Sequence, residues 1–315
     1  MVRVFVSAHL PEEILAPVRS LAEVEVWDEE RQVPRSMLLE RLGACHGWLS
    51  MLTDTIDAEL LDAAPGLTVI SQMSVGVDNI DVAACRERGV RLGHTPDVLT
   101  ETVADTAFAL MAAAVRQLPQ GEALVKSGAW GPWDPWHSLG GDLYRAQLGI
   151  IGMGRIGQAI ARRARGFDME IRYTSPSPKD VPDSSQVGLD ELLAESYLVV
   201  VAAPLTAETK WMIGARELER MRDDAILVNI ARGPLVDTTA LVDALARGSI
   251  GGAALDVTDP EPLPPDHPLL QFSNCLVVPH IGSASVRARR AMAQLAVDNL
   301  VAALRGETMP ASLLD

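Results

Sequence analysis

Six short apolar runs recur between residues 148 and 280, and the segments between them have the pattern of helices. The runs begin at residues 148, 170, 198, 225, 250 and 276 and are LGIIGMG, EIRYT, LVVVAAP, AILVNIAR, IGGAALDV and LVVPH. Such nearly continuous apolar runs are typical of strands whose two faces are both covered by helices. A first alternation, with strand-like VRVFV, VEVW, GWLSM and LTVI, fills the first hundred residues. We therefore expect an α/β protein with two parallel sheets flanked by helices.

Helical patterns occupy most of the remaining chain. In the first alternation they are PEEILAPVRSLA, PRSMLLERLG and DAELLDAA. A long helix pattern begins near Thr100 and runs through TETVADTAFALMAAAVRQLPQGEALVKSGAW. The last pattern, SVRARRAMAQLAVDNLVAALRG, ends at Gly306, a typical helix stop. Between the two long patterns, AWGPWDPWHSLGGDLYR predicts an ordered loop.

The composition is that of an acidic globular protein. The 315 residues are enough for two modest domains, 48% of them are hydrophobic, and the formal net charge is −15. The charge argues against a nucleic-acid or anionic-membrane partner. No apolar segment approaches the roughly 18 residues that a membrane helix needs. Cys45, Cys85 and Cys275 lie far apart and form no CxxC pair, so we expect reduced thiols in a cytoplasmic protein and no metal site.

The segment GIIGMGRIGQAIARRA carries a GxGxxG motif between a strand-like run and an amphipathic helix. Gly152 would allow the tight turn, Gly154 would let the backbone approach a pyrophosphate, and Gly157 would let the helix pack on the strand. The start of the helix supplies N–H groups and positive potential. The motif in this context predicts a dinucleotide site; the alternative is a glycine-rich turn without a ligand.

The end of the next strand bears on which dinucleotide binds. NAD enzymes usually carry an acid there for the ribose 2′-hydroxyl, but this chain has Thr174 and Ser175, and no acid before Asp180. The missing acid, the two hydroxyls and Lys179 favour NADP over NAD. The alternative is a solvated Ser/Pro loop that is indifferent to either cofactor.

Four more strands end in residues of a special kind. They are Pro204, Arg232, Asp256 and His280. Because ligands of open α/β sheets bind outside the carboxyl ends of the strands, these residues are expected to surround a ligand.

Three side chains are candidates for catalysis. Arg232 offers a fork that suits a carboxylate, and Glu261, stiffened by flanking prolines, could orient His280 and keep it charged. The alternatives are a surface ion pair for Arg232, a solvated loop acid for Glu261, and a strand-end histidine bonded to backbone for His280.

These motifs together resemble one family. GIIGMGRIGQAIARR, LVNIARGPLVD, ALDVTDPEPLPPDHPLL and VVPHIGSAS are similar to the D-isomer-specific 2-hydroxyacid dehydrogenases. Within that family, MSVGVDNID, GHTPDVLTETVADTAFAL and WGPWDPW are most similar to the glyoxylate/hydroxypyruvate reductases. The resemblance runs from about Gly47 to Pro310. It implies an oxidoreductase that reduces glyoxylate and hydroxypyruvate to glycolate and D-glycerate by hydride transfer from NADPH, with NAD as a possible cofactor.

The resemblance also implies an architecture and residue roles. A Rossmann-type cofactor domain, residues 99–286, would be inserted into a flavodoxin-like substrate domain, residues 1–98 and 287–315. Arg232 would bind the substrate carboxylate and polarise the keto oxygen, and His280, paired with Glu261, would donate a proton to that oxygen. The substrate pocket would also contain the N–H groups of Val75 and Gly76 and the side chain of Ser283. The matching cofactor positions are Gly154, Arg155, Ile156, Pro204, Ile230, Asp256 and Gly282.

Members of this family are homodimers through the cofactor domain, here with an arm at about residues 100–142. Trp136 or His137 would reach the substrate pocket of the neighbouring chain; alternatively Trp130, Trp133 and Trp136 only pack in the dimer. Two other functions stay open: another D-2-hydroxyacid or phosphite dehydrogenase, and a nucleotide-sensing protein like the corepressors that share the fold.

Overall fold

The computed structural model describes residues 1–314 and contains two compact units. One unit consists of Met1–Leu99 and the chain from Ser285 onward, and the other is Thr100–Ala284. The second unit is thus inserted into the first in sequence. These limits lie close to the domain boundaries that the resemblance implies.

The first unit is built on a six-stranded sheet with the order β13-β5-β4-β3-β1-β2. All neighbouring strands are parallel except β13, which pairs antiparallel with β5. The order 2-1-3-4-5 of its parallel strands is the flavodoxin-like order. The strands are β1 (Arg3–Val6), β2 (Glu23–Val26), β3 (Gly47–Ser50), β4 (Val69–Gln72), β5 (Arg91–Gly93) and β13 (Ser312–Leu314).

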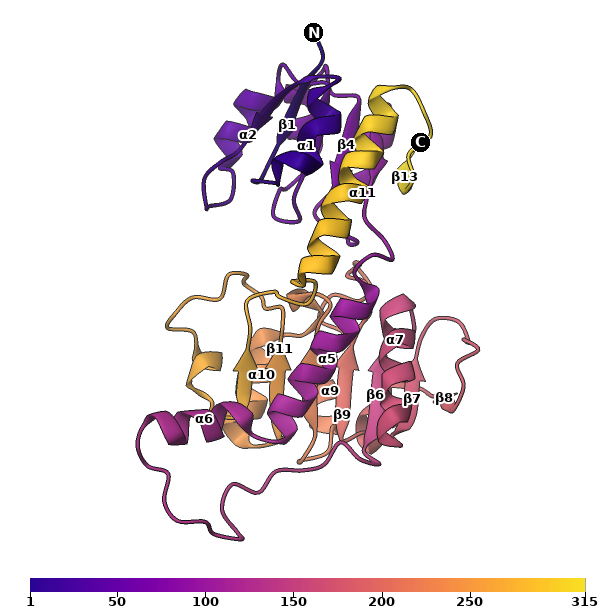
Figure 1. Ribbon diagram of the computed structural model, residues 1–315. Helices are drawn as coiled ribbons and strands as arrows, with labels where there is room; N and C mark the ends of the chain where they lie inside the picture. The colour runs from indigo at the N-terminus through magenta and orange to yellow at the C-terminus, as the bar shows by residue number, and fades with distance from the viewer. Residues whose placement is uncertain (315) are drawn as a thin grey trace. The chain divides into compact units, whose positions relative to one another are not determined.

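Helices cover both faces of this sheet. On one face α11 packs on β3, β4 and β5 and against α1 (Figure 1). On the other face α2, α3 and α4 share a core with Phe5, Trp48 and Ile70 of the strands. Side-chain caps from Asp57, Asp81 and Ser285 start α3, α4 and α11. The helices are α1 (Glu12–Arg19), α2 (Arg35–Leu42), α3 (Ala58–Ala63), α4 (Val82–Glu87) and α11 (Val286–Leu304).

The second unit is built on a seven-stranded parallel sheet with the order β12-β11-β10-β9-β6-β7-β8. The chain leaves β6 toward β7 and β8 and then returns to β9, so the strand order reverses between β6 and β9. This is the Rossmann order, and the reversal marks the place where ligands bind. The strands are β6 (Gln147–Ile151), β7 (Glu170–Thr174), β8 (Ser184–Gln186), β9 (Leu198–Val201), β10 (Ile226–Asn229), β11 (Gly252–Leu255) and β12 (Cys275–Val277).

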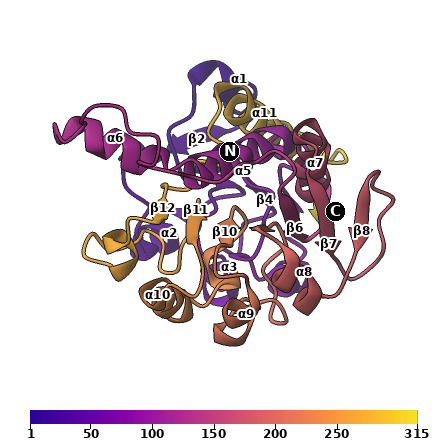
Figure 2. The same ribbon diagram turned by 90° about the horizontal axis from the view of Figure 1, so that it is seen from below.

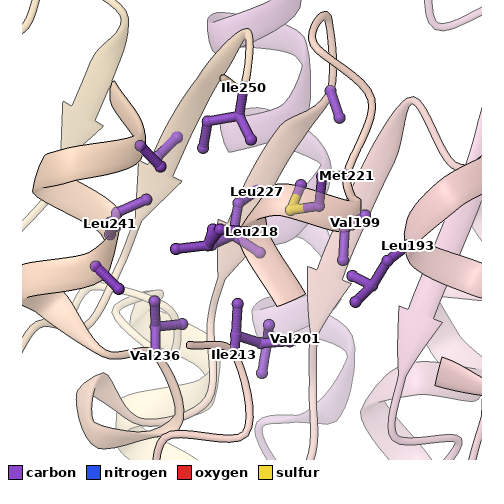
Figure 3. Packing of buried hydrophobic residues seen from close by; sticks show 14 of the residues in the cluster. Leu193, Val199, Val201, Ile213, Leu218, Met221, Leu227, Val236, Leu241 and Ile250 are labelled. Atoms are coloured by element: carbon purple, nitrogen blue, oxygen red, sulfur yellow. The ribbon is translucent and has the colours of Figure 1, made fainter. Parts of the chain in front are cut away.

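Two layers of helices enclose the second sheet. Figure 2 shows α5 (Thr100–Val115), α6 (Leu118–Lys126) and α7 (Arg155–Ala164) on one face, and α8 (Leu189–Glu195), α9 (Ala215–Arg220) and α10 (Thr238–Arg247) on the other. Alternate strand residues such as Val199 and Val201 point to the same face and meet Leu193, Leu218 and Leu241 of the helices in a fully apolar core (Figure 3). Three short 3-10 helices, Arg165–Phe167, Gly233–Leu235 and Pro268–Gln271, complete the unit. The predicted fold class is confirmed in both units.

The long helix predicted from Thr100 onward is wrong in one respect, because the structure contains two helices there. The chain leaves the helical conformation at Gln117, which has a left-handed φ of 51°. Pro119 is the second residue of α6, and a proline, which has no N–H, fits only the first turn of a helix. The Trp-rich loop that follows forms no helix or strand, as expected.

Among the α-helices and strands, four short ones were not expected from the sequence: α4, β5, β8 and β13. Their patterns are three to six residues long, too short to show a period. Within residues 1–314, no helix is long and apolar enough to cross a membrane. Cys45, Cys85 and Cys275 are free thiols.

Candidate active site

The glycine loop follows β6 and opens α7. Gly152 has a φ of +99°, and a Cβ there would lie 2.7 Å from the backbone of Ala202 and Ala203, so only glycine fits. At Gly157 a Cβ would lie 2.2 Å from the Gly152 carbonyl oxygen, so the third glycine lets the helix close on the turn. At Gly154 a Cβ would meet nothing within 4 Å. The backbone is thus open where a pyrophosphate would approach the start of α7, and the loop fits a dinucleotide.

Arg155 and Ile156 form the first turn of α7 directly after this loop. The Arg155 side chain is exposed, and Ile156 is half-buried. Both residues are therefore at the helix start that faces the predicted pyrophosphate position.

The loop after β7 is held in shape by its own hydrogen bonds. The Tyr173 hydroxyl accepts the N–H of Lys179 and donates to its carbonyl oxygen, each at 2.9 Å. Gln186 Nε2 donates to the Ser175 carbonyl oxygen at 2.9 Å, and the Ser175 hydroxyl donates to Ser177 O at 2.5 Å. Thr174 and Ser175 are half-buried and Lys179 is exposed. The strand end therefore presents hydroxyls, with a lysine nearby, where an NAD site carries an acid.

His280 and Glu261 are in contact. His280 Nδ1 lies 2.6 Å from Glu261 Oε1, and the two side chains are 23% and 35% exposed. Burial by itself would raise the pKa of Glu261. The hydrogen bond and charge of His280, the Thr258 N–H and the charge of Arg232 outweigh it and hold that pKa below its usual value. Glu261 is therefore an ionised partner that fixes the imidazole ring.

Asp256, a buried residue that follows β11, fixes the turn that carries His280. The Asp256 carboxylate accepts the N–H groups of Ile281 at 2.7 Å and Gly282 at 2.9 Å. A Cβ at Gly282 would lie 2.6 Å from Asp256 Oδ2, so a larger residue would disturb this contact. His280 itself has a left-handed φ of 51°, and its N–H donates to the Asp256 carbonyl oxygen at 2.9 Å. Asp256, expected at the cofactor, thus also holds the backbone of the catalytic candidate.

Arg232 follows β10 in a loop that lies against the loop of Thr258. A Cβ at Gly233 would lie 1.9 Å from the Thr258 carbonyl oxygen, so glycine is required for this approach. The buried side chain of Asn229 donates to the Arg232 carbonyl oxygen at 2.8 Å and accepts the Ala231 N–H at 3.1 Å. The ends of β10, β11 and β12 thus bring Arg232, Glu261 and His280 to one edge of the sheet. Sequence reasoning did not assign a role to Asn229, although a polar residue ending an apolar strand was a visible signal.

Three further candidates lie at the same edge. Ile230 is buried after β10, Pro204 is exposed after β9 and accepts the Thr209 hydroxyl at 2.7 Å, and Ser283 is half-buried just beyond Gly282. They are placed where ligands of such sheets bind.

Two predicted groups lie elsewhere. Val75 and Gly76 belong to the first unit, where they follow β4 and are half-buried. Trp136 and His137 lie in the loop after α6, and the Trp136 side chain is 80% exposed. Trp136 is therefore not packed inside the unit that carries His280.

Comparison with known proteins identifies the family to which the chain is related. Residues 108–282 match the family model described as D-isomer specific 2-hydroxyacid dehydrogenase, NAD binding domain. A glyoxylate reductase from Korarchaeum cryptofilum is 45% identical over 98% of this chain and 94% of its own length. The crystal structure of the TT0316 protein from Thermus thermophilus superposes with a TM-score of 0.95 at 46% identity, over 99% of this chain and all of that one.

A second solved structure is similar to the chain and contains a bound cofactor. It is an NADPH-dependent glyoxylate/hydroxypyruvate reductase from Sinorhizobium meliloti in complex with NADP and malonate, with a TM-score of 0.86 and 33% identity over 99% of this chain and 96% of that one. The family-model match covers more than half of the chain, and the full-length relative exceeds 40% identity. The chain therefore belongs to the D-isomer specific 2-hydroxyacid dehydrogenase family and is an oxidoreductase of that family.

Proposed function

We propose that the enzyme reduces glyoxylate to glycolate and hydroxypyruvate to D-glycerate, with NADPH as the preferred cofactor. The observation that carries the proposal is the 2.6 Å contact between His280 Nδ1 and Glu261 Oε1, at the same sheet edge as Arg232. An imidazolium held by a carboxylate, beside an arginine that can bind a carboxylate, is the apparatus that reduction of a small keto acid needs. The Korarchaeum and Sinorhizobium relatives are both named as glyoxylate reductases.

The three side chains have different roles in the proposed reaction. Arg232 binds the substrate carboxylate and polarises the keto oxygen. His280 gives the proton on Nε2 to that oxygen, which leaves a neutral imidazole, and Glu261 keeps the ring oriented through Nδ1. When bound, the nicotinamide supplies a hydride. The C–H and O–H bonds of the product thus come from the cofactor and from His280.

The remaining contacts would hold the two ligands. The glycine loop, with Arg155 and Ile156, would bind the pyrophosphate; Pro204, Ile230, Asp256 and Gly282 would border the nicotinamide half. The N–H groups of Val75 and Gly76 would bind the substrate carboxylate, and Ser283 would line the substrate pocket.

The preference for NADPH rests on the end of β7. Thr174 and Ser175 stand where an acid would repel a 2′-phosphate, and Lys179 is an exposed cation on the same loop. The similar Sinorhizobium enzyme is itself described as NADPH-dependent.

The proposed enzyme is a homodimer through its cofactor unit. The segment that begins with α6 exposes large apolar side chains, which a soluble monomer would leave in water. They are Leu118, Val125, Trp130, Trp133, Trp136, Leu139 and Tyr144. A second copy of the chain would cover them, and Trp136 or His137 would then extend toward the partner's substrate. The free, separated thiols agree with a cytoplasmic location.

A panel of 2-keto acids assayed with NADPH and NADH tests the proposal. We expect glyoxylate and hydroxypyruvate to drive oxidation of both cofactors, faster with NADPH at equal concentration. No oxidation with either acid would refute the reductase, and reduction of NAD by phosphite alone would identify a phosphite dehydrogenase. A faster reaction with NADH would refute the cofactor preference alone.

A further inference from the structure

The loop that carries Val75 and Gly76 has three consecutive carbonyl groups that are each held by a named donor. Ser74 O accepts the Thr95 N–H at 2.8 Å. Val75 O lies 3.2 Å from His94 Nδ1. Gly76 O accepts Gln72 Nε2 at 2.8 Å and the Ser74 hydroxyl at 2.5 Å. Three successive peptide planes are therefore fixed.

Fixing a carbonyl also fixes the N–H of the next residue. The peptide group is planar and trans, so its N–H points opposite to its C=O. The bond at Ser74 O therefore sets the direction of the Val75 N–H, and the contact at Val75 O sets the direction of the Gly76 N–H. These are the two N–H groups that the proposed function assigns to the substrate carboxylate.

His94 must be the donor in its contact with Val75. A carbonyl oxygen can only accept, so Nδ1 of the ring carries the proton. The His94 backbone is itself anchored, since its N–H donates to Ala311 O at 3.1 Å and its carbonyl accepts Asn299 Nδ2 at 2.9 Å. The backbone that carries this donor, directly after β5, is thus fixed on both sides of the Cα atom.

A pair of amide side chains, from the buried Gln72 and the half-buried Asn79, holds the loop at Gly76. Gln72 is completely buried, and its amide exchanges two hydrogen bonds of 2.9 Å with that of Asn79. Asn79 Nδ2 also donates to the Asp54 carbonyl oxygen at 2.7 Å. A hydrogen-bonded network around a buried amide favours one conformation, because any other would leave the amide of Gln72 unpaired. The end of the loop therefore has little freedom.

We propose that His94 is a positioning residue that, through Val75 O, aims the Gly76 N–H at the substrate carboxylate, while the Gln72–Asn79 pair holds the peptide that follows. The role rests on the proposed keto-acid reductase, since it concerns the same carboxylate. His94 touches neither substrate nor cofactor in this scheme; it acts through the peptide group.

The variants His94→Asn and His94→Leu separate this role from packing. Asn places an amide nitrogen on the γ-carbon, where histidine has Nδ1, and Leu places a methyl group there. We expect His94→Leu to raise the KM for glyoxylate about tenfold, with kcat and the KM for NADPH within about twofold of wild type. We expect His94→Asn to restore the KM for glyoxylate to within about twofold of wild type.

His46→Leu is the matched control. His46 directly precedes β3, at the amino end of the strands of the same sheet, whereas His94 follows β5 at the carboxyl end. Nδ1 of His46 accepts the Arg3 N–H. This variant should leave the KM for glyoxylate unchanged. If His94→Leu does not fold, His94→Ala removes the same donor and gives the same comparison with His94→Asn.

Three results would overturn the proposal. An unchanged KM for glyoxylate in His94→Leu would remove the positioning role and leave the reductase intact. Equal rises in His94→Leu and His94→Asn would indicate a packing role instead. A wild-type protein that reduces no keto acid would refute the proposed function, and the positioning role would fall with it.

Discussion

Glu261 Oε1 lies 2.6 Å from Nδ1 of His280, so the carboxylate occupies one ring nitrogen and leaves the other for chemistry. Because an ionised carboxylate only accepts, Nδ1 carries a proton in this bond. Nε2 is then the atom that can give a proton to a keto oxygen. The contact therefore sets both the orientation of the ring and the direction of proton donation.

Replacing Glu261 with glutamine tests this pairing. Glu261→Gln removes the negative charge and keeps the size of the side chain. We expect kcat for glyoxylate to fall roughly 10²-fold, because His280 loses the charged carboxylate that orients its ring. Steady-state kinetics with glyoxylate checks this. A variant with the wild-type kcat would show that Glu261 does not support His280.

Arg232→Lys keeps the positive charge and removes the planar fork. We expect kcat/KM for glyoxylate to fall roughly 30-fold, which corresponds to about 2 kcal/mol of lost stabilisation. NADPH binding, measured by fluorescence titration, should not change. An equal loss of NADPH affinity would instead assign Arg232 to the cofactor.

Alanine at the second and at the third glycine of the loop should impair different properties, cofactor binding at Gly154 and stability at Gly157. Gly157→Ala puts a Cβ 2.2 Å from Gly152 O, so we expect a loss of about 1–3 kcal/mol in unfolding free energy. Gly154→Ala meets no protein atom within 4 Å, so we expect wild-type stability with weaker NADPH binding. Urea unfolding and NADPH titration distinguish the two. Full NADPH affinity in Gly154→Ala would contradict the proposed pyrophosphate approach.

Because of Asp54, we expect the free energy of unfolding of the first unit to depend on pH. Burial raises the pKa of Asp54 from 3.8 to about 6, against hydrogen bonding from the Met51 N–H and Ser7. The folded state therefore binds the Asp54 proton more tightly than the unfolded state does. The contribution of this proton to the free energy of unfolding is complete below pH ~4 and is lost as pH rises through the folded-state pKa. Asp54→Asn cannot ionise and should be more stable than wild type above pH ~6, by up to about 3 kcal/mol.

Urea unfolding of wild type and Asp54→Asn at several pH values measures this difference. Asp62→Asn is the control, because the Asp62 side chain is 68% exposed. A stability difference between Asp54→Asn and wild type that does not vary with pH would contradict the raised pKa of Asp54 as its cause.

The sequence predicted most of the long helices and most of the strands whose two faces are covered by helices. Strands such as Leu198–Val201 are uniformly apolar and therefore visible as strands. The edge strand Ser184–Gln186 is short and polar, so it had no such signal. The break at Gln117 depends on a single backbone angle, which an otherwise helical pattern conceals.

The sequence predicted a candidate site at the strand ends, but the contacts across the sheet became visible only in the folded structure. His280 and Glu261 are 19 residues apart, and only the pairing of β11 with β12 brings their loops together. Asp256 was expected at the cofactor, and its bonds to Ile281 and Gly282 could not be foreseen. His94 had no motif that marked it.

The proton-donor role of His280 is tested most directly by comparing wild type with His280→Ala in two measurements: NADPH binding, and oxidation of bound NADPH by glyoxylate in a single turnover. We expect an unchanged dissociation constant for NADPH and a loss of at least about 10²-fold in the rate of oxidation. Wild-type oxidation by His280→Ala would contradict His280 as the proton donor, and a loss of NADPH binding would give it a structural role instead.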